Sequence, residues 1–500
     1  MIVDELPLKN ADVNAFYRRL KLSLERGSAT AYRHYAERRS YDELLQLVRR
    51  VVQVLQPHRR RRVLVYSGKE PAAYGAIYGI LLSGNVWVPM APDQAEGRNR
   101  DILEQTEAAL LFTGEPLPEA LAAAAAERGV QVVPFDSLPP ADSAGDFDLP
   151  DFQPDDEAYV MFTSGSAGRP AGVPITHANY TNFILAVLDI LPFKDNEVFA
   201  DYHDFTFDIS IFNLFCCPLM GGCFVPTIGM GDKVLPLRLI QEHRVTVWSS
   251  APSVIARIAQ AEADEPVPSS IRIALLCGEP LSLDVLRYCQ TNMAIPHVFN
   301  FYGLTETGVE NFFHECRSDD VRRYQAYGYV PIGWPLPGNG IRVTENKELL
   351  LSGVQLTPGY LDGAGQDRFE IIDGQRWFHT GDVLEHHQGV WFCKGRLDSQ
   401  IKLNGYRIEL MDIEVNLKRQ PGVAEAVCFV EEAGDRKRLA AVLQPADAET
   451  VLDLNLIRRE IAKSLPSYMI PARMEIVEQL PYNANGKIDR RQVSERHASA

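Results

Sequence analysis

The sequence predicts an α/β fold with a large N-terminal part and a small C-terminal α+β part. Up to about Gly338, short apolar runs that suit buried strands alternate with longer segments of helical period, which is typical of a largely parallel sheet. After Gly338 the pattern changes to short alternating stretches between Gly-rich turns, which indicates β-structure. Because 500 residues are too many for one ordinary hydrophobic core, we expect two or more domains.

The N-terminal part contains five runs with the length and composition of buried strands: Val63–Tyr66, Ala109–Phe112, Ala158–Phe162, Val245–Trp248 and Ile273–Leu276. Between them lie segments with helical period: Tyr41–Leu55, Ala72–Leu82, Pro118–Glu127, Pro252–Glu262 and Leu281–Thr291. Pro118 and Pro252 suit the first turn of a helix, where no N–H group is needed. The acidic, Pro-rich stretch Ser137–Glu157 is expected to be an exposed loop.

The C-terminal part begins with alternating stretches that predict strands: Glu348–Ser352, Arg376–His379 and Val390–Lys394. A small α+β unit follows, with helices over Leu410–Arg419 and Val451–Leu465 and strands over Val423–Glu431, Arg438–Gln444 and Arg473–Val477. We place the domain boundary near Arg396–Asp398, which gives domains 1–396 and 397–500.

Composition excludes several classes of protein. The formal net charge of -16 argues against nucleic-acid binding, which needs a clustered basic surface. The basic run Arg59–Arg62 precedes a strand and is better interpreted as a solvated loop. No apolar run approaches the length of a membrane span, and the acidic N-terminus Met1–Leu6 does not resemble a signal peptide.

The cysteines are scattered and form neither a CxxC pair nor a Cys/His metal signature. They are expected to be reduced, mostly buried thiols of a cytoplasmic protein. They are Cys216, Cys217, Cys223, Cys277, Cys289, Cys316, Cys393 and Cys428.

A Gly- and Ser-rich loop follows the predicted strand Tyr159–Phe162. Its glycines let backbone N–H groups turn toward an anion, and its hydroxyl groups add donors. A loop at the carboxyl end of a strand is where open α/β sheets bind ligands. The loop lacks the G-K-[ST] ending of a Walker A motif, and on its own it is also compatible with a flexible turn.

The loop Phe162–Gly172 resembles the signature loop of the adenylate-forming superfamily, which includes acyl-CoA synthetases, luciferases and nonribosomal peptide adenylation domains. The resemblance implies ATP as substrate, with phosphates bound by Thr163, Ser164, Gly165, Ser166 and Gly168. Two positions depart from the usual pattern: Ala167 replaces a threonine and Ala171 replaces a lysine. Arg169, two positions before Ala171, offers an alternative cation.

The segment Asn300–Thr307 resembles the N-x-Y-G-x-T-E motif of the same superfamily. The resemblance implies that AMP or ATP contacts residues at the start of the segment, namely Asn300, Phe301, Tyr302 and Gly303. Thr305 is expected to donate to the α-phosphate, and Glu306 offers the carboxylate oxygens that Mg²⁺ prefers. Gly84–Pro92 resembles a further superfamily segment, for which we expect a structural role.

Two later segments resemble the superfamily around the predicted domain boundary. In Thr380–Asp382, Asp382 would accept from the ribose hydroxyls. In Gly395–Glu409, Arg396 would also bind the ribose, and Asp398 is the hinge about which a mobile C-terminal domain rotates. Three residues of this segment would face the second half-reaction: Lys402, Gly405 and Arg407.

The segment Leu480–Arg490 resembles the closing motif L-P-x-T-x-N-G-K-[IV]-D-R. By this match Lys487 is the catalytic lysine, assisted by Thr305 and by Mg²⁺ on Glu306. Such cations and donors stabilise the charge that develops when a substrate carboxylate attacks the α-phosphorus of ATP. The resemblance also implies a large N-terminal domain of stacked α/β sheets with a β-barrel-like part.

The segment Phe205–Ser210 resembles the F-D-x-S segment of amino-acid-activating members, in which Asp208 matches the partner of the α-ammonium group. A buried carboxylate there would be costly without a cation. The matching positions of the amino-acid pocket are Ile209, Phe212, Ser249, Leu275, Cys277, Phe301, Val309 and Glu310. The chain resembles most the free-standing members that activate alanine or proline, including the D-alanine ligases. We expect a small neutral amino acid (Ala, Pro or Ser), and second a small cationic one, because Glu310 is unusual beside an apolar side chain.

Only Ile488–Ala500 follow Lys487, so we expect a free-standing enzyme whose acceptor is the phosphopantetheine thiol of a separate carrier protein, as in nonribosomal peptide and antibiotic biosynthesis. Two alternatives stay open. One is an acyl-CoA synthetase that uses free coenzyme A, against which Asp208 argues. The other is a non-catalytic ATP/AMP-binding relative, which Ala167 and Ala171 leave open.

Overall fold

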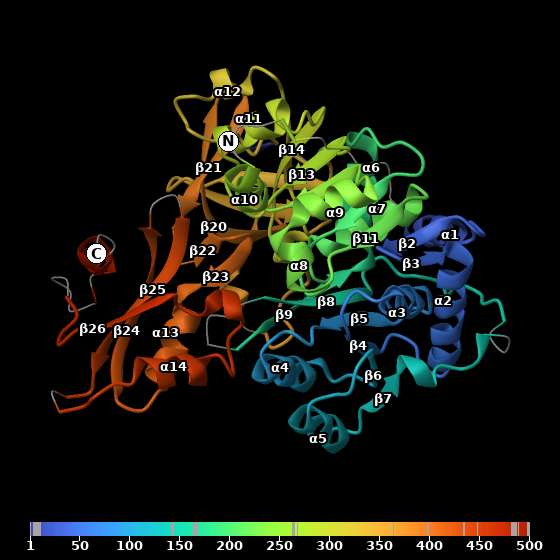
Figure 1. The fold of residues 1–500 in the computed structure, drawn as a ribbon, viewed down its shortest axis with the longest axis horizontal. Helices are drawn as coiled ribbons and strands as arrows, with labels where there is room; N and C mark the ends of the chain where they lie inside the picture. Colours follow the sequence, from blue (N-terminus) through green and yellow to red (C-terminus); the bar gives the residue numbers. More distant parts are fainter. Residues whose placement is uncertain are drawn as a thin grey trace.

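The computed structural model describes residues 2–3, 12–141, 145–163, 169–262, 266–267, 269–363, 365–397, 400–433, 436–447, 449–481, 488 and 490–497 (Figure 1). Several predicted site residues lie outside the described residues: Ser164, Gly165, Ser166 and Gly168 of the loop, Asp398 and Lys487. For these the sequence predictions are unchanged.

Two parallel-rich sheets form the main body of the structure. The first has six strands in the order β7 (Gln131–Pro134), β6 (Leu110–Thr113), β4 (Arg62–Tyr66), β5 (Val86–Met90), β8 (Glu157–Thr163) and β9 (Ala171–Thr176). The second has nine, in the order β16 (Trp334–Pro335), β15 (Phe312–Cys316), β14 (His297–Tyr302), β13 (Ile273–Leu276), β12 (Val247–Ser250), β10 (Val198–Asp201), β11 (Cys223–Pro226), β2 (Thr30–His34) and β3 (Glu37–Ser40). Among the strands described, antiparallel pairing occurs only at the ends of the two sheets. The antiparallel pairs are β8–β9, β14–β15, β15–β16 and β2–β3.

Helices cover both faces of the two sheets. A core cluster between the sheets joins alternate strand residues such as Val63 and Val247 to α1 (Val13–Leu24), α2 (Tyr41–Leu55), α3 (Pro71–Leu82), α6 (His177–Ile190) and α7 (Ser210–Leu219). The outer face of the first sheet packs on α4 (Glu96–Thr106) and α5 (Glu119–Glu127). The outer face of the second packs on α9 (Pro236–His243), α10 (Pro252–Glu262) and α11 (Leu283–Thr291). The result is a five-layered α/β body, because each strand buries both of its faces.

Local sequence explains why these helices form where they do. The α2 helix begins after Ser40, whose hydroxyl accepts from the Glu43 N–H while the Glu43 carboxylate accepts from the Ser40 N–H. Its buried residues recur with helical period, at Leu44, Val48, Val51 and Leu55 among others, and face the core between the sheets. Two short helices complete the body: α8 (Gly229–Val234) and α12 (Asp320–Arg323).

A third, antiparallel sheet lies beside the second one. Its order is β1 (Ile2–Val3), β17 (Asn339–Val343), β18 (Glu348–Gly353), β20 (Gln375–His387) and β19 (Phe369–Ile372), with β21 (Val390–Arg396) paired to β20. This sheet is the predicted β part of the large domain. Its strand order, for the described residues, is an open path from β1 to β19.

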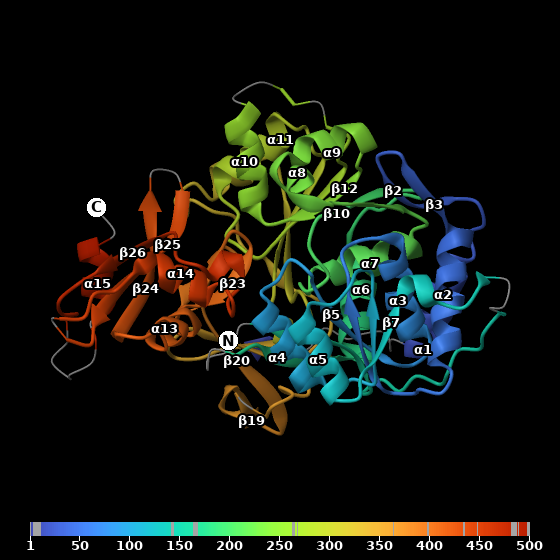
Figure 2. The same ribbon diagram turned by 60° about the horizontal axis from the view of Figure 1, so that its bottom comes forward.

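The small C-terminal unit lies on one side of the main body (Figures 1 and 2). It contains the hairpin β22 (Gln400–Leu403) and β23 (Tyr406–Glu409), and a sheet in the order β24 (Val423–Ala433), β25 (Arg436–Pro445) and β26 (Arg473–Ile476). One face of that sheet packs on α13 (Leu410–Lys418) and α14 (Leu454–Ile461), and the other on α15 (Arg490–His497). The predicted α/β fold with a large and a small part is therefore confirmed.

Most predicted elements occur within one or two residues of their predicted bounds, and the differences have local causes. Pro118 precedes α5 instead of opening it. The predicted helix Val451–Leu465 is shorter, because the Asp453 carboxylate accepts from the N–H groups of Asn455 and Leu456 and so starts the helix at Leu454. The described part of the loop 137–157 is not wholly exposed, since Phe152 is buried and stacks on Tyr17.

The eight cysteines are all free thiols, and six of them are buried. This confirms the expectation that most of the thiols are buried. Within the described parts of the chain, no helix combines the length and the apolar character that crossing a lipid bilayer requires.

Candidate active site

Strands of both parallel-rich sheets end around two adjoining cavities. The small cavity, of about 110 Å³, is lined by residues at the carboxyl ends of β8, β13 and β14 and by the loop between β10 and α7. The larger cavity, of about 490 Å³, lies between β14, the β20–β21 hairpin and the small C-terminal unit. Gly278 and Lys402 line both cavities, so the two adjoin each other. Carboxyl ends of parallel strands are where open α/β sheets bind ligands.

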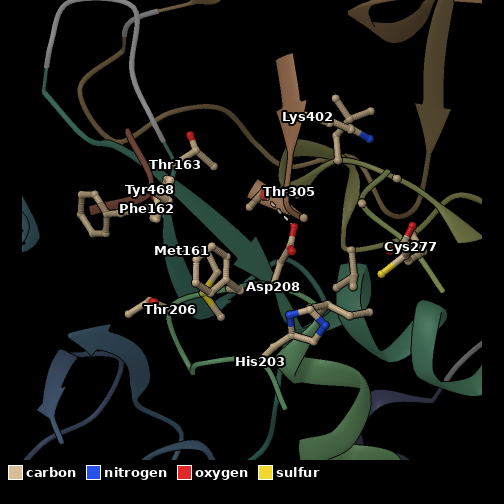
Figure 3. A pocket seen from close by; sticks show the side chains of 18 of the residues that line it. Met161, Phe162, Thr163, His203, Thr206, Asp208, Cys277, Thr305, Lys402 and Tyr468 are labelled. Atoms are coloured by element: carbon tan, nitrogen blue, oxygen red, sulfur yellow. Dashed lines mark hydrogen bonds between the residues drawn. The ribbon is translucent and has the colours of Figure 1, made fainter. Parts of the chain in front are cut away.

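Asp208 and Thr305 meet in the small cavity. The Thr305 hydroxyl donates to Asp208 Oδ2 over 2.6 Å, and Figure 3 shows the two side chains pointing toward each other. Asp208 comes from the loop before α7, whereas Thr305 opens the short 3-10 turn Thr305–Thr307 after β14. The structure thus brings together two predicted residues that lie 97 positions apart in the sequence.

The loop that carries Asp208 starts from a buried ionic contact. Asp201, the last residue of β10, pairs with Lys69 Nζ at 3.4 Å and accepts from the Tyr74 hydroxyl. Burial lowers the pKa of Lys69, while the charge of Asp201 opposes this shift. Because both groups are buried, each depends on the other for its charged form. The contact therefore fixes where the loop leaves the sheet.

Glu310 and Cys277 form the acidic side of the small cavity. Both are almost fully buried, at 5% and 4% exposure, and the Cys277 thiol interacts with the Glu310 carboxyl. Burial and the charge of Asp208 raise the pKa of Glu310 to about 8. Burial and the Glu310 carboxyl likewise raise the pKa of Cys277 well above its ordinary value, so this thiol is not an activated nucleophile.

The larger cavity collects Asn300, Phe301, Tyr302, Asp382 and Arg396, all predicted to contact the nucleotide. The Tyr302 hydroxyl donates to Asp382 Oδ2, and Arg396 donates to Asp382 Oδ1 over 3.0 Å. Arg396 also donates to the carbonyl of Thr380 over 2.8 Å. The carboxylate is therefore held in place at the wall of a cavity that also presents the Tyr302 ring.

Glu306 is the predicted ligand of a cation. It is 2% exposed, and its Oε1 accepts from the Tyr360 hydroxyl over 2.7 Å. Glu306 lines neither of the two cavities, but its buried carboxylate, which follows Thr305 in the chain, provides hard oxygen ligands of the kind that Mg²⁺ binds together with phosphates. The residues present therefore fit such an ion.

A second possible metal-binding group lies elsewhere, on β15 and α12, and comprises His314, Cys316 and Asp320. Asp320 Oδ2 already accepts from the His314 ring and from the Arg317 N–H. We interpret this group as a structural contact that holds the turn after β15.

The hairpin β22–β23 brings the small unit into the site. Lys402 Nζ lies 4.8 Å from the centroid of the Tyr302 ring, at the junction of the two cavities. The Gly405 N–H donates to Glu279 Oε1 over 2.8 Å. Gly405 has a φ of 82°, and a Cβ at this position would lie 2.7 Å from Cβ of Ala251. Only glycine fits this approach without displacement.

A third cavity, of about 290 Å³, opens between the large and small parts. It shares Gln94, His203, Phe207, Gly405 and Tyr468 with the small cavity. Its wall includes the stacked rings of Tyr406 and Tyr468, whose centroids are 4.0 Å apart. The small cavity is thus bordered on one side by a second space that leads between the two parts.

Family models match most of the chain. The model described as AMP-binding enzyme matches residues 23–361, and that of the AMP-binding enzyme C-terminal domain matches residues 412–487. The chain belongs to the AMP-binding enzyme family. The first match contains Asp208, Thr305, Glu306 and Glu310, and the second ends at Lys487.

Curated relatives in this family align over nearly the whole chain. The chain is 32% identical to an L-proline–[L-prolyl-carrier protein] ligase of Streptomyces coelicolor over 472 residues, which cover 86% of each protein. It is 29% identical to a D-alanine–D-alanyl carrier protein ligase of Staphylococcus epidermidis, covering 94% of this chain and 96% of the relative.

Solved structures share the fold. A Vibrio cholerae adenylation domain in complex with glycyl-adenosine-5'-phosphate superposes with a TM-score of 0.82 at 22% identity, covering 99% of both chains. A nonribosomal peptide synthetase protein with adenylation and PCP domains superposes with a TM-score of 0.81 at 25% identity, covering 97% of this chain and 84% of that one. These comparisons agree with the stacked sheets and the small C-terminal unit described above.

Within this AMP-binding enzyme, the predicted amino-acid pocket is only partly assembled. Ile209, Cys277, Val309 and Glu310 line the small cavity, and Phe301 lines the larger one. Phe212, Ser249 and Leu275 do not line either cavity, because they are fully buried on α7, β12 and β13.

The phosphate loop is described only at its ends. Thr163 lines the small cavity. Ala171 on β9 is the strand partner of Thr163 on β8. Arg169, considered above as a replacement cation, instead pairs with Asp101 at 2.6 Å and with Glu104 at 3.2 Å on α4. Because two carboxylates already balance its charge, we do not assign Arg169 to the phosphates.

Among the residues of the small cavity that sequence reasoning did not assign to the site are Gln94, Arg98, His203 and Tyr468. His203 follows the carboxyl end of β10, and burial lowers the pKa of its ring to about 3, so it is neutral. A His five residues before Asp208 was the available signal. Arg98 donates to the Phe162 carbonyl, a contact that no sequence pattern indicates.

Residues on both sides of the segment 482–487 pack away from the site. Leu480 belongs to a cluster with Val427, Phe429 and Val493 on the α15 side of β24 and β25, and Ile488 packs against it. In both overall views α15 lies at the outer edge of the small unit, opposite the main body (Figures 1 and 2).

Proposed function

We propose that this AMP-binding enzyme activates a small amino acid with ATP to form an aminoacyl-AMP, and then transfers the aminoacyl group to the phosphopantetheine thiol of a separate carrier protein. The observation that carries the proposal is the contact between Asp208 and Thr305 in a small cavity that adjoins a larger one. The two curated relatives, which are named amino acid–carrier protein ligases, support the substrate and the acceptor.

The small cavity suits the amino acid. At about 110 Å³ it is below the range of roughly 300–1,000 Å³ that is typical of sites for drug-sized ligands, so it favours a molecule with few heavy atoms. Asp208 provides a carboxylate for the α-ammonium group, which would otherwise be costly to bring out of water. The hydroxyl of Thr305, which donates to Asp208 here, would turn to donate to the α-phosphate when ATP is bound.

The larger cavity suits the nucleotide. The Asp382 carboxylate, oriented by Tyr302 and Arg396, can accept from two neighbouring ribose hydroxyls. The Tyr302 ring offers a flat face to adenine, and we assign Asn300, Phe301 and Gly303 to the same nucleotide. Glu306 would hold Mg²⁺, which when bound supplies positive charge to the phosphates.

Two bonds change in the first half-reaction. A carboxylate oxygen of the amino acid bonds to the α-phosphorus, and the bond from that phosphorus to the pyrophosphate oxygen breaks. Negative charge accumulates on the phosphate oxygens, so we assign Lys487 and Thr305 to their stabilisation. In the second half-reaction the thiol sulfur attacks the carbonyl carbon and AMP leaves.

We assign the arrangement described above to the second half-reaction. Gly405 and Lys402 border the site, and the neighbours of Lys487 pack on the far face of the small unit. The first half-reaction would need Lys487 to enter, so we propose that domain 397–500 rotates about Asp398 against domain 1–396. In the arrangement described, the cavity between the two parts would admit the phosphopantetheine arm.

Two assays test this function. Amino-acid-dependent exchange of pyrophosphate into ATP, run over amino acids of both configurations, tests activation, and the absence of exchange above background would instead indicate a non-catalytic relative. Transfer to a phosphopantetheine-loaded carrier protein is then compared with transfer to free coenzyme A. Preference for coenzyme A would favour the acyl-CoA synthetase alternative. The eight free thiols support our proposal that the enzyme acts in the cytoplasm.

A further inference from the structure

Glu310 holds a fixed position in the small cavity through its backbone. Its carbonyl accepts from Gln355 Nε2 over 2.8 Å, and a Cβ on Gly303 would lie 2.4 Å from the Glu310 Cα. The segment Val309–Glu310 therefore packs directly on the backbone of Gly303, next to the end of β14. These contacts hold the backbone of Glu310 and do not involve its carboxyl group.

The Glu310 carboxyl has unused hydrogen-bonding capacity inside the cavity. Its Oε2 is buried and has no hydrogen-bond partner, although the thiol of Cys277 interacts with the same carboxyl. A buried polar atom without a partner costs roughly 1–3 kcal/mol, so native structures retain few of them, and each calls for an explanation such as a catalytic role or a bound water or ion. The residue also lines the cavity that holds Asp208.

We propose that the substrate is an α-amino acid whose short side chain ends in a hydrogen-bond donor, a hydroxyl or an amine, and that Glu310 accepts this donor. This rests on the proposed function, because Asp208 then holds the α-ammonium group and Glu310 is left to face the side chain. A purely apolar side chain, such as that of alanine or proline, would leave Oε2 unpaired.

The titratable groups around Glu310 determine its protonation state, and this state distinguishes a hydroxyl donor from an amine donor. They are the Asp208 carboxylate, the Cys277 thiol and the Lys402 ammonium group. With a pKa of about 8, Glu310 is mostly a neutral acid at pH 7, and it can exchange hydrogen bonds with a hydroxyl in both directions. An ammonium group needs the ionised carboxylate instead. The hydroxyl substrate is therefore favoured at neutral pH, and the amine gains as the pH approaches 8.

The test compares matched amino acids in the pyrophosphate exchange assay. Serine is compared with alanine, and 2,4-diaminobutyrate with 2-aminobutyrate, because each pair differs chiefly in the terminal donor. For the wild type we expect a kcat/KM at least about tenfold higher for one donor-bearing member than for its apolar partner, as sites built for a hydrogen bond discriminate. In Glu310→Val this ratio should fall at least about tenfold, because the donor loses its acceptor while the apolar side chain gains a contact.

A second variant distinguishes charge from hydrogen bonding. Glu310→Gln keeps an acceptor and a donor but cannot ionise, so it should retain serine and lose 2,4-diaminobutyrate. Glu315→Val, at an exposed position of β15, is the matched control and should change neither ratio. Thermal unfolding of each variant shows that it folds.

The outcomes separate the inference from the function on which it rests. Exchange with alanine or proline at least equal to that with both donor-bearing amino acids, and a ratio unchanged in Glu310→Val and in Glu310→Gln, would overturn the role of Glu310 while leaving amino-acid activation intact. Failure of every amino acid to support exchange would instead overturn the proposed function.

Discussion

Replacing Gly405 with alanine should slow thioester formation far more than adenylation. Gly405 lies where the hairpin of the small unit contacts the main body, and an added Cβ would lie 2.7 Å from Cβ of Ala251. Forcing an extra carbon into a packed contact costs about 1–3 kcal/mol. A destabilisation of that size lowers the population of the docked arrangement about 5- to 150-fold.

The effect of backbone strain in Gly405→Ala must be distinguished from the effect of the contact with Ala251. Gly405 has a φ of 82°, and alanine in the left-handed region costs about 1–2 kcal/mol anywhere in the chain. Gly374 is a matched control, because its φ is 80° and a Cβ there would meet nothing within 4 Å. Gly374→Ala therefore carries the same strain without the contact.

The assay is single-turnover transfer from supplied aminoacyl-AMP to a loaded carrier protein, with pyrophosphate exchange measured in parallel. We expect transfer by Gly405→Ala to fall about 10- to 100-fold and exchange to change much less, whereas Gly374→Ala should affect neither strongly. An equal loss of both half-reactions in Gly405→Ala, or equally slow transfer in Gly374→Ala, would refute the assignment of this hairpin to the second half-reaction.

Three further outcomes are expected. Lys487→Ala should abolish pyrophosphate exchange and spare transfer from supplied aminoacyl-AMP, and equal loss of both reactions would contradict the division of labour. Lys69→Met should lower the free energy of unfolding by about 3–5 kcal/mol in urea titrations, because it leaves buried Asp201 without a cation, whereas exposed Lys463→Met should not. Folding raises the pKa of Glu310 from 4.5 to about 8, so the folded state binds more protons between these values and this group's stabilisation is lost as the pH rises from about 5 to 8. The wild type should therefore lose Tm relative to Glu310→Gln over that range, and parallel Tm curves would contradict the raised pKa.

Local patterns predicted the elements because their causes are local. The bounds of α2 and α10 and of β13 agree with the sequence prediction, since caps, prolines and apolar runs lie within the elements themselves. Asp208 and Thr305 were expected at one site for a different reason, because their segments resemble two motifs of one superfamily.

Contacts between distant segments were not predictable in this way. Arg169 faces two acids on α4, some 65 positions away, and no local motif marks that pairing. Phe212, Ser249 and Leu275 were assigned by position, but all three are fully buried and do not line the cavity. How far a cavity extends is set by packing across several elements and not by any one of them.

Lys402 links the two halves of the site electrostatically. In the arrangement described, its ammonium group lines the same cavity as Asp208 and Glu310 and lowers the pKa of Glu310, against the larger opposing effects of burial and Asp208. An amino acid brings its own ammonium group to this cavity, so bound substrate and Lys402 both supply positive charge to the same carboxylates. Like charges in a buried site disfavour each other, and a ligand shifts a conformational equilibrium by its differential affinity for the two states. Binding of the amino acid should therefore favour withdrawal of the β22–β23 hairpin, which is the movement that the first half-reaction needs.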